Sequence, residues 1–192
     1  SRTPVREAFR QLELEGLIQI IPNKGAYVTG ITAKDVQDIY MIRSLLEGLC
    51  ARWATEHITE MQLEELEENV YLADFHASKG HLDQMADLDN RFHHILYEAC
   101  NSRQLERLLV DFHEYVLRVR KKTLSNGGRG KRSNDEHRQI MEAIKAKDGR
   151  RAEELAHEHM INAYDNMVKN GLYHIYPAEG EENPGTEEKD KP

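Results

Sequence analysis

Helical periodicity runs through most of the chain and constrains its fold more than any other feature. After Gly30, apolar residues recur at the three- and four-residue spacing of amphipathic helices. Thr32 with Asp35, and Thr59 with Gln62, form capping boxes, in which each side chain satisfies a free backbone amide at the start of a helix. We expect these helices to form an all-α antiparallel bundle. The pattern predicts helices from residue 32, over 59–78, 82–100 and 102–122, and on both sides of a turn at 147–148.

The first 30 residues follow a different pattern, that of a short helix and a β-hairpin. Pro4 lies in the first turn of a helix predicted over 1–16, and Gly16 is placed to end it. The runs LIQII and AYVTG flank the turn sequence PNKG, which predicts two antiparallel strands. This segment holds four basic and three acidic side chains, so its charge alone gives little support for a nucleic-acid partner.

Two segments lack helical periodicity. SNGGRGKRSN (125–134) has the composition of a flexible, basic loop, and the acidic residues 175–192 are typical of a disordered tail. Cys50 and Cys100 lie in amphipathic helical patterns, which favours core thiols in a reducing cytoplasm over a disulfide. The chain has no secretory signal and no apolar run of the roughly 18 residues that a membrane span needs. We therefore expect a soluble, cytoplasmic protein.

Four polar residues occupy core-facing helical positions. Asp89 and His93 are four residues apart, so they project from one face of a helix. His137 precedes the 147–148 turn by about ten residues and His159 follows it by about eleven, so the two should meet across a helical hairpin. One carboxylate and three imidazoles suit a divalent ion such as Zn or Ni, with positions open for water or a ligand. The alternative is a set of core polar groups that satisfy one another, and spacing alone does not decide.

The remaining histidines give no comparable pattern. His157 is two positions from His159 and should face roughly the opposite side of its helix, and His94 is one position off its apolar stripe. The others have no partner at a useful spacing, and we expect them at the surface or in packing contacts: His57, His76, His81, His113 and His174.

Arg43 lies beside the apolar stripe of the first long helix, one turn before Glu47. It could pair with Glu47 or another carboxylate of the bundle. It could equally hold the carboxylate of a small acid bound at the metal, because a guanidinium matches a carboxylate with two parallel hydrogen bonds. The stripe itself is predicted to contain Ile39, Ile42, Leu46, Leu49 or Cys50, and Trp53.

Several segments resemble those of a known family. SRTPVREAFRQLELEGLIQIIPNKGAYVTG resembles the recognition helix and wing of GntR-family bacterial transcription factors. IRSLLEGLCARWA, DLDNRFHHILYEACNS and DEHRQIMEAIKAKDGRRAEELAHEHM resemble the effector-binding FCD domain of the FadR-like branch. The resemblance implies a mainly α fold, with a partial winged helix-turn-helix over 1–30 and an all-helical metal-binding, effector-binding and dimerisation domain over 31–174. Because the helical pattern starts at the first residue, we expect the N-terminal part of the winged helix to be missing.

The resemblance also implies the site residues. It places the metal ligands at Asp89, His93, His137 and His159, and an arginine beside the effector at Arg43. Hydroxyls and backbone amides can position the protein on phosphates while arginines read guanine, although Arg2 and Arg6 taken alone would be a solvated helix face. The implied DNA contacts are Ser1, Arg2, Thr3 and Arg6 in the helix, with Lys24 and Gly25 at the wing tip.

These features predict a homodimeric, DNA-binding transcriptional regulator, in the family's commoner mode a repressor, that senses a small organic or sugar acid. Two DNA-binding heads would read a pseudo-palindromic operator, although a fragment with an incomplete winged helix should bind DNA poorly. A metal-dependent hydrolase using the same four ligands is one alternative, but HEHM at 157–160 is not the HExxH of metalloproteases. A metal-free regulator that binds an acyl ligand is another, but it would leave four polar side chains unpartnered in an apolar cavity.

Overall fold

The computed structural model describes residues 1–15, 18–28, 31–123 and 129–171. The capping boxes at Thr32 and Thr59 and the turn at Lys147 lie where the sequence predicted them, and Lys147 takes a left-handed backbone conformation with φ 57°. The elements in chain order are α1 (Arg2–Leu14), β1 (Ile18–Ile21), β2 (Gly25–Val28), α2 (Ala33–His57), α3 (Glu60–Lys79), α4 (Leu82–Ala99), α5 (Arg103–Thr123), α6 (Arg129–Lys145) and α7 (Gly149–Lys169).

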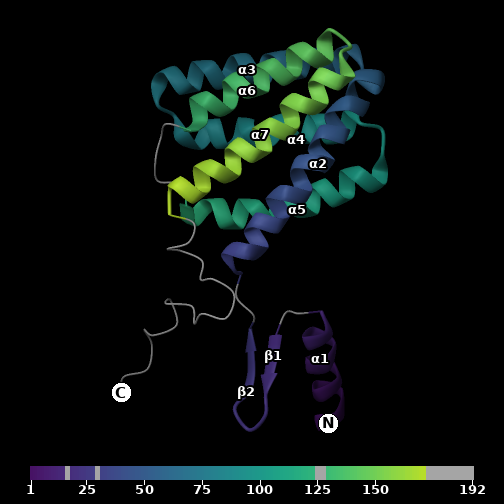
Figure 1. The fold of residues 1–192 in the computed structure, drawn as a ribbon, viewed down its shortest axis with the longest axis vertical. Coiled ribbons are helices and arrows are strands. Elements are labelled where there is room, and N and C mark those ends of the chain that lie inside the picture. Colours follow the sequence, from purple (N-terminus) through teal and green to yellow (C-terminus); the bar gives the residue numbers. More distant parts are fainter. Residues whose placement is uncertain (16–17, 29–30, 124–128, 172–192) are drawn as a thin grey trace.

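A helix and a hairpin form the N-terminal unit, as expected (Figure 1). Strands β1 and β2 pair antiparallel, in a register that places Ile18 opposite Val28 and Ile21 opposite Gly25. Gly25 has φ +121°, a conformation that side chains disfavour, so glycine suits this turn. Helix α1 lies against β1, where the Glu13 carboxylate accepts a hydrogen bond of 3.0 Å from the backbone N–H of Ile20.

The other six helices pack as a bundle in which the contact between α2 and α7 is the most extensive (Figure 1). Small residues make this crossing possible. A Cβ atom on Gly48 would lie 3.0 Å from the carbonyl oxygen of Glu153, and one on Gly149 would lie 3.0 Å from the Thr55 hydroxyl. Helices α3 and α4 form one antiparallel hairpin, and α6 and α7 form another. Among the described residues, no helix combines the length and apolar character needed to cross a bilayer.

The apolar stripe predicted on α2 is wrong in part. Ile42 is 45% exposed and its neighbour Leu45 is 67% exposed. The buried face instead carries Tyr40, Arg43 and Glu47. The reason is that Arg43 and Glu47 neutralise each other inside the bundle, and a hydropathy pattern does not count such a pair as core.

The basic loop predicted over 125–134 is also wrong in part. Residues 129–134 belong to α6, whereas 124–128 and the predicted tail lie outside the described residues. Tertiary contacts hold this first turn and a half of α6. The Ser133 hydroxyl donates to Asp89 at 3.0 Å, and the Asn134 side chain donates to the Val70 carbonyl at 3.1 Å. These partners are distant in the sequence, so the local composition does not indicate them.

Candidate metal and effector site

Three buried histidines converge where α4, α6 and α7 meet. His93, His137 and His159 each place one ring nitrogen within 4.8 Å of the other two. The Nε2 atoms of His137 and His159 are 3.3 Å apart, the face-to-face arrangement expected from their positions around the α6–α7 turn. Each residue is at most 4% exposed, so the three imidazoles depend on one another and on nearby protein groups for polar partners.

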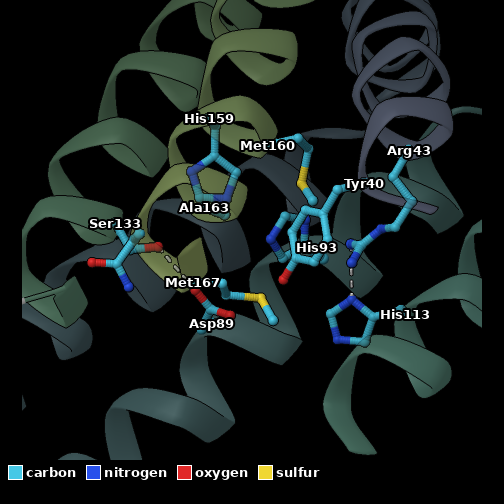
Figure 2. Close-up of a pocket in the computed structure, with 11 residues that line it drawn as sticks. Tyr40, Arg43, Asp89, His93, His113, Ser133, His159, Met160, Ala163 and Met167 are labelled. Atoms are coloured by element: carbon cyan, nitrogen blue, oxygen red, sulfur yellow. Dashed lines mark hydrogen bonds between the residues drawn. The ribbon is translucent and has the colours of Figure 1, made fainter. Parts of the chain in front are cut away.

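Asp89 lies one helical turn before His93 on α4, and the two residues line the same small cavity. Its Oδ1 atom is 3.8 Å from His137 Nε2, beyond hydrogen-bond length, and accepts a hydrogen bond of 3.0 Å from the Ser133 hydroxyl. Figure 2 shows the Asp89 carboxylate turned toward Ser133. The structure thus brings all four sequence-predicted ligands into one region, with the three imidazoles closer together than the carboxylate.

Two of the three imidazoles have a carboxylate on their outer nitrogen. His93 Nδ1 lies 2.9 Å from Glu47 Oε2, and His159 Nδ1 lies 2.7 Å from Glu136 Oε2. An ionised carboxylate only accepts hydrogen bonds, so each Nδ1 carries the proton and each Nε2 carries a lone pair, which in His159 faces His137 Nε2 at 3.3 Å. The third ring, His137, stacks on Phe92 with a centroid distance of 3.9 Å and an interplanar angle of 8°.

Burial sets the protonation of these groups. It lowers the pKa of His137, and the neighbouring His159 lowers it further. It also lowers the pKa of His159, although the Glu136 carboxylate opposes the change. Burial alone would raise the pKa of Glu47, but His93 and Arg43 outweigh it and hold that pKa well below its ordinary value. These shifts favour neutral imidazoles at His137 and His159 and an ionised carboxylate at Glu47.

Arg43 extends the site into a buried polar network. Its guanidinium forms an ion pair with Glu47 and donates to the Tyr97 hydroxyl at 3.2 Å. Tyr97 in turn donates to Glu47 Oε1 at 2.6 Å. Of the two interpretations of Arg43, pairing with Glu47 is thus observed. Arg43 also borders the cavity, so contact with an effector stays a prediction.

His113 was missed as a site residue. It is 2% exposed on α5, where Arg43 Nη2 donates to its Nδ1 at 3.3 Å (Figure 2). Its Nε2 therefore carries the proton and donates to Asn90 Oδ1 at 3.1 Å. Burial, with help from His93 and Arg43, lowers the pKa of His113 to about 3. A signal was available, because His113 continues the buried stripe of Leu105 and Leu109.

Other residues also departed from expectation. His76 and His81, predicted to lack partners, face each other across the α3–α4 turn with their Nδ1 atoms 3.0 Å apart. The sequence did not indicate a role for Glu136, because the predicted metal site used only the adjacent His137. Its contact with His159 arises only when α6 packs on α7.

The cavity at the centre is small, with a volume of about 30 Å³. His93, His159 and Asp89 border one side, Arg43 and His113 border another, and α7 adds an apolar wall of Met160, Ala163 and Met167 (Figure 2). Such a volume holds one or two water molecules. A larger ligand would have to displace the flexible methionine side chains.

The predicted DNA contacts lie on the N-terminal unit, and all of them are exposed. Figure 1 shows the start of α1 and the β1–β2 turn at the same end of this unit. The residues are Ser1, Arg2, Thr3 and Arg6 at the start of α1, with Lys24 and Gly25 at the turn.

Comparison with known proteins gives matches along most of the chain. The FCD domain family matches residues 38–162. The HTH-type transcriptional repressor RspR of Escherichia coli K12 is 32% identical over 160 residues, which cover 83% of this chain and 70% of that protein. A GntR-family transcriptional regulator from Pseudomonas syringae pv. tomato has a similar crystal structure, with a TM-score of 0.64, 26% identity and coverage of 91% and 72%. The metal-free FCD domain of TM0439 shares the fold, with a TM-score of 0.62, 22% identity and coverage of 76% and 99%.

Proposed function

The chain belongs to the GntR family of HTH-type transcriptional regulators, in the branch with an FCD domain, and from this premise we propose that its helical bundle is a metal-dependent acid sensor. The bundle would bind a divalent ion, Zn or Ni, through Asp89, His93, His137 and His159. A small carboxylate effector would bind beside the ion and alter binding to operator DNA.

The convergence of three imidazoles with carboxylates on their outer nitrogens carries this proposal. Metal-binding histidines nearly always donate their second N–H to a carboxylate, a carbonyl or water. Two nitrogens bound to one tetrahedral zinc at its usual bond length lie roughly 3.3 Å apart, and His137 and His159 hold their Nε2 atoms at 3.3 Å. Without an ion, three buried imidazoles would share few polar partners, at a cost in desolvation. The donor set therefore fits a borderline divalent ion.

The shape and polarity of the cavity support a small acid as the effector. A bound ion would supply a positive centre for one carboxylate oxygen, and Arg43 lies across the cavity as a second cationic group. From a volume of about 30 Å³, an acyl chain would require a much larger displacement of the methionine side chains than a small acid, which favours the small acid over the acyl-ligand alternative. Membership of a regulator family favours sensing over the hydrolase alternative.

DNA binding would use the six residues predicted on α1 and the β1–β2 turn, in a cytoplasmic homodimer acting as a repressor. The relative named as a repressor supports that direction of regulation. The exposed apolar residues Ile42 and Leu45 on α2 support self-association, because large apolar side chains rarely cluster on a surface that stays in water.

The metal content of purified protein tests the proposal. We expect about one equivalent of Zn or Ni per chain after loading and dialysis, measured by mass spectrometry of the elements. His159→Ala should lose most of this metal. His157→Ala is the matched control, because His157 lies on the same helix outside the cluster and should leave binding unchanged. Failure of the wild-type protein to bind either ion, or equal loss in both variants, would contradict the proposed site.

A further inference from the structure

Glu47 is a buried carboxylate that joins two helices at the edge of the histidine cluster. It lies on α2 and is 3% exposed. Its Oε2 accepts from His93 Nδ1 on α4 at 2.9 Å, and its Oε1 accepts from the Tyr97 hydroxyl at 2.6 Å and from Arg43. One side chain thus fixes a predicted metal ligand and the predicted effector arginine together.

We propose that Glu47 is the positioning residue through which metal occupancy reaches α2. The inference rests on the proposed metal site. The four proposed ligands come from α4, α6 and α7, so the ion itself would not touch α2. Through Glu47, α2 is hydrogen-bonded to the ring of His93. A change in metal occupancy at that ring can therefore reach α2.

The chemistry of the imidazole ring gives this attachment its dependence on metal. A cation at Nε2 of His93 draws electron density from the ring, which makes the opposite N–H a stronger donor. The hydrogen bond to Glu47 then becomes stronger because donor and acceptor carry opposite partial or full charges. In return, the carboxylate holds the ring in the tautomer that leaves Nε2 free for a cation.

Glu136 shows why Glu47 is distinctive. It makes the equivalent contact with His159 Nδ1 at 2.7 Å, but it lies on α6, which already supplies His137 to the centre. Its hydrogen bond therefore ties together two helices that an ion would join directly. Glu47 instead brings in a helix that begins at Ala33, five residues after β2 ends at Val28. That helix is the bundle element nearest in sequence to the hairpin.

Zinc binding and hydrogen exchange, measured on the same variants, test the inference. Zn²⁺ is titrated into metal-free wild type, Glu47→Gln and the matched control Glu136→Gln against a chromophoric chelator. Both variants should bind Zn²⁺ about 10–100-fold more weakly, since each loses a carboxylate behind a ligand. At saturating Zn²⁺, amide exchange in α2 around Arg43 and Glu47 should slow in wild type and Glu136→Gln. In Glu47→Gln it should slow only in α4, α6 and α7.

The other possible outcomes distinguish failure of this inference from failure of the proposed metal site. If wild type binds no Zn²⁺, the proposed metal site fails and this inference fails with it. If wild type binds Zn²⁺ and α2 of Glu47→Gln is protected as in wild type, only the role of Glu47 is overturned. Should Glu47→Gln unfold because Arg43 loses its counter-charge, the double variant Arg43→Met with Glu47→Gln removes both charges. It is expected to show the same loss of the α2 response.

Discussion

Among the described residues, four buried histidines lie close together in the bundle, and burial lowers the pKa of three of them, His113, His137 and His159. His93, His137 and His159 form the cluster, and His113 adjoins it through Arg43. Charging His113, His137 or His159 in the metal-free protein would place a cation in a largely buried region. A neutral imidazole also keeps a lone pair that can bind a metal. Burial therefore explains both the loss of stability expected in acid and the capacity for metal binding.

The metal-free protein should therefore lose stability on acidification, in part through His113. Its pKa is about 3 in the folded protein, against an ordinary value of 6.5, so the unfolded chain binds more protons between these values. The free energy of unfolding should be at its full value above pH 6.5 and fall as the pH drops toward 3. Urea unfolding at several pH values, in the presence of a chelator, measures this slope.

His113→Gln is the matched variant for that experiment. It removes the titrating ring while keeping a neutral side chain that can hydrogen-bond to Asn90. The slope of stability against pH below 6.5 should become shallower, although it should persist in part because burial lowers the pKa of His137 as well. An unchanged slope would show that His113 titrates normally in the folded state.

Among the elements, the crossing of α2 and α7 depends on two glycines, and Gly48 is the one that faces backbone. A Cβ on Gly48 would already lie 3.0 Å from the carbonyl oxygen of Glu153, a backbone atom that moves only with its helix. Gly48→Val should destabilise the fold by about 1–3 kcal/mol through overpacking. Glu56→Ala, at an exposed position of the same helix, should change stability by only about 0.5 kcal/mol. Chemical denaturation of the two variants compares them directly, and equal effects would mean that the helices can separate without cost.

The sequence predicted some elements well because their signals are local. Thr32 and Thr59 marked two helix starts, since a capping box involves residues only three positions apart. The start of α6 was missed because Ser133 and Asn134 are held by α3 and α4, more than 40 residues away. The buried face of α2 was misassigned for a similar reason, since the partners of Glu47 include residues of α4.

The candidate site likewise combines features that local spacing predicts with features that depend on long-range packing. Spacing could predict that Asp89 shares a face with His93 and that His137 meets His159 across the α6–α7 hairpin, whereas their role as ligands came from the family resemblance. The carboxylates behind the histidines could not be predicted, because nothing in the sequence relates Glu47 to a residue 46 positions later. Helical spacing reveals which residues share a face, whereas pairing between faces depends on how the helices pack.

For the whole molecule, the exposed part of α2 bears on assembly. Ile42 and Leu45 face outward from a bundle that buries its other large apolar side chains on this helix more fully. The variant Ile42→Asp with Leu45→Asp should convert a homodimer to a monomer without unfolding it, because both positions tolerate solvent. Light scattering after size-exclusion chromatography measures the mass, and circular dichroism checks the helices. A double variant that stays dimeric would place the interface elsewhere.

The charged groups around the cavity also fix an order of events. Three carboxylates, those of Glu47, Asp89 and Glu136, contact the histidine cluster, and the Arg43 guanidinium pairs with only one of them, Glu47. An excess of carboxylates over fixed cations disfavours the approach of an organic anion and favours a divalent ion. Under the proposed function, the acid can therefore bind only after the metal. The regulator would then respond to the presence of a transition metal and a small acid together, in place of either one alone.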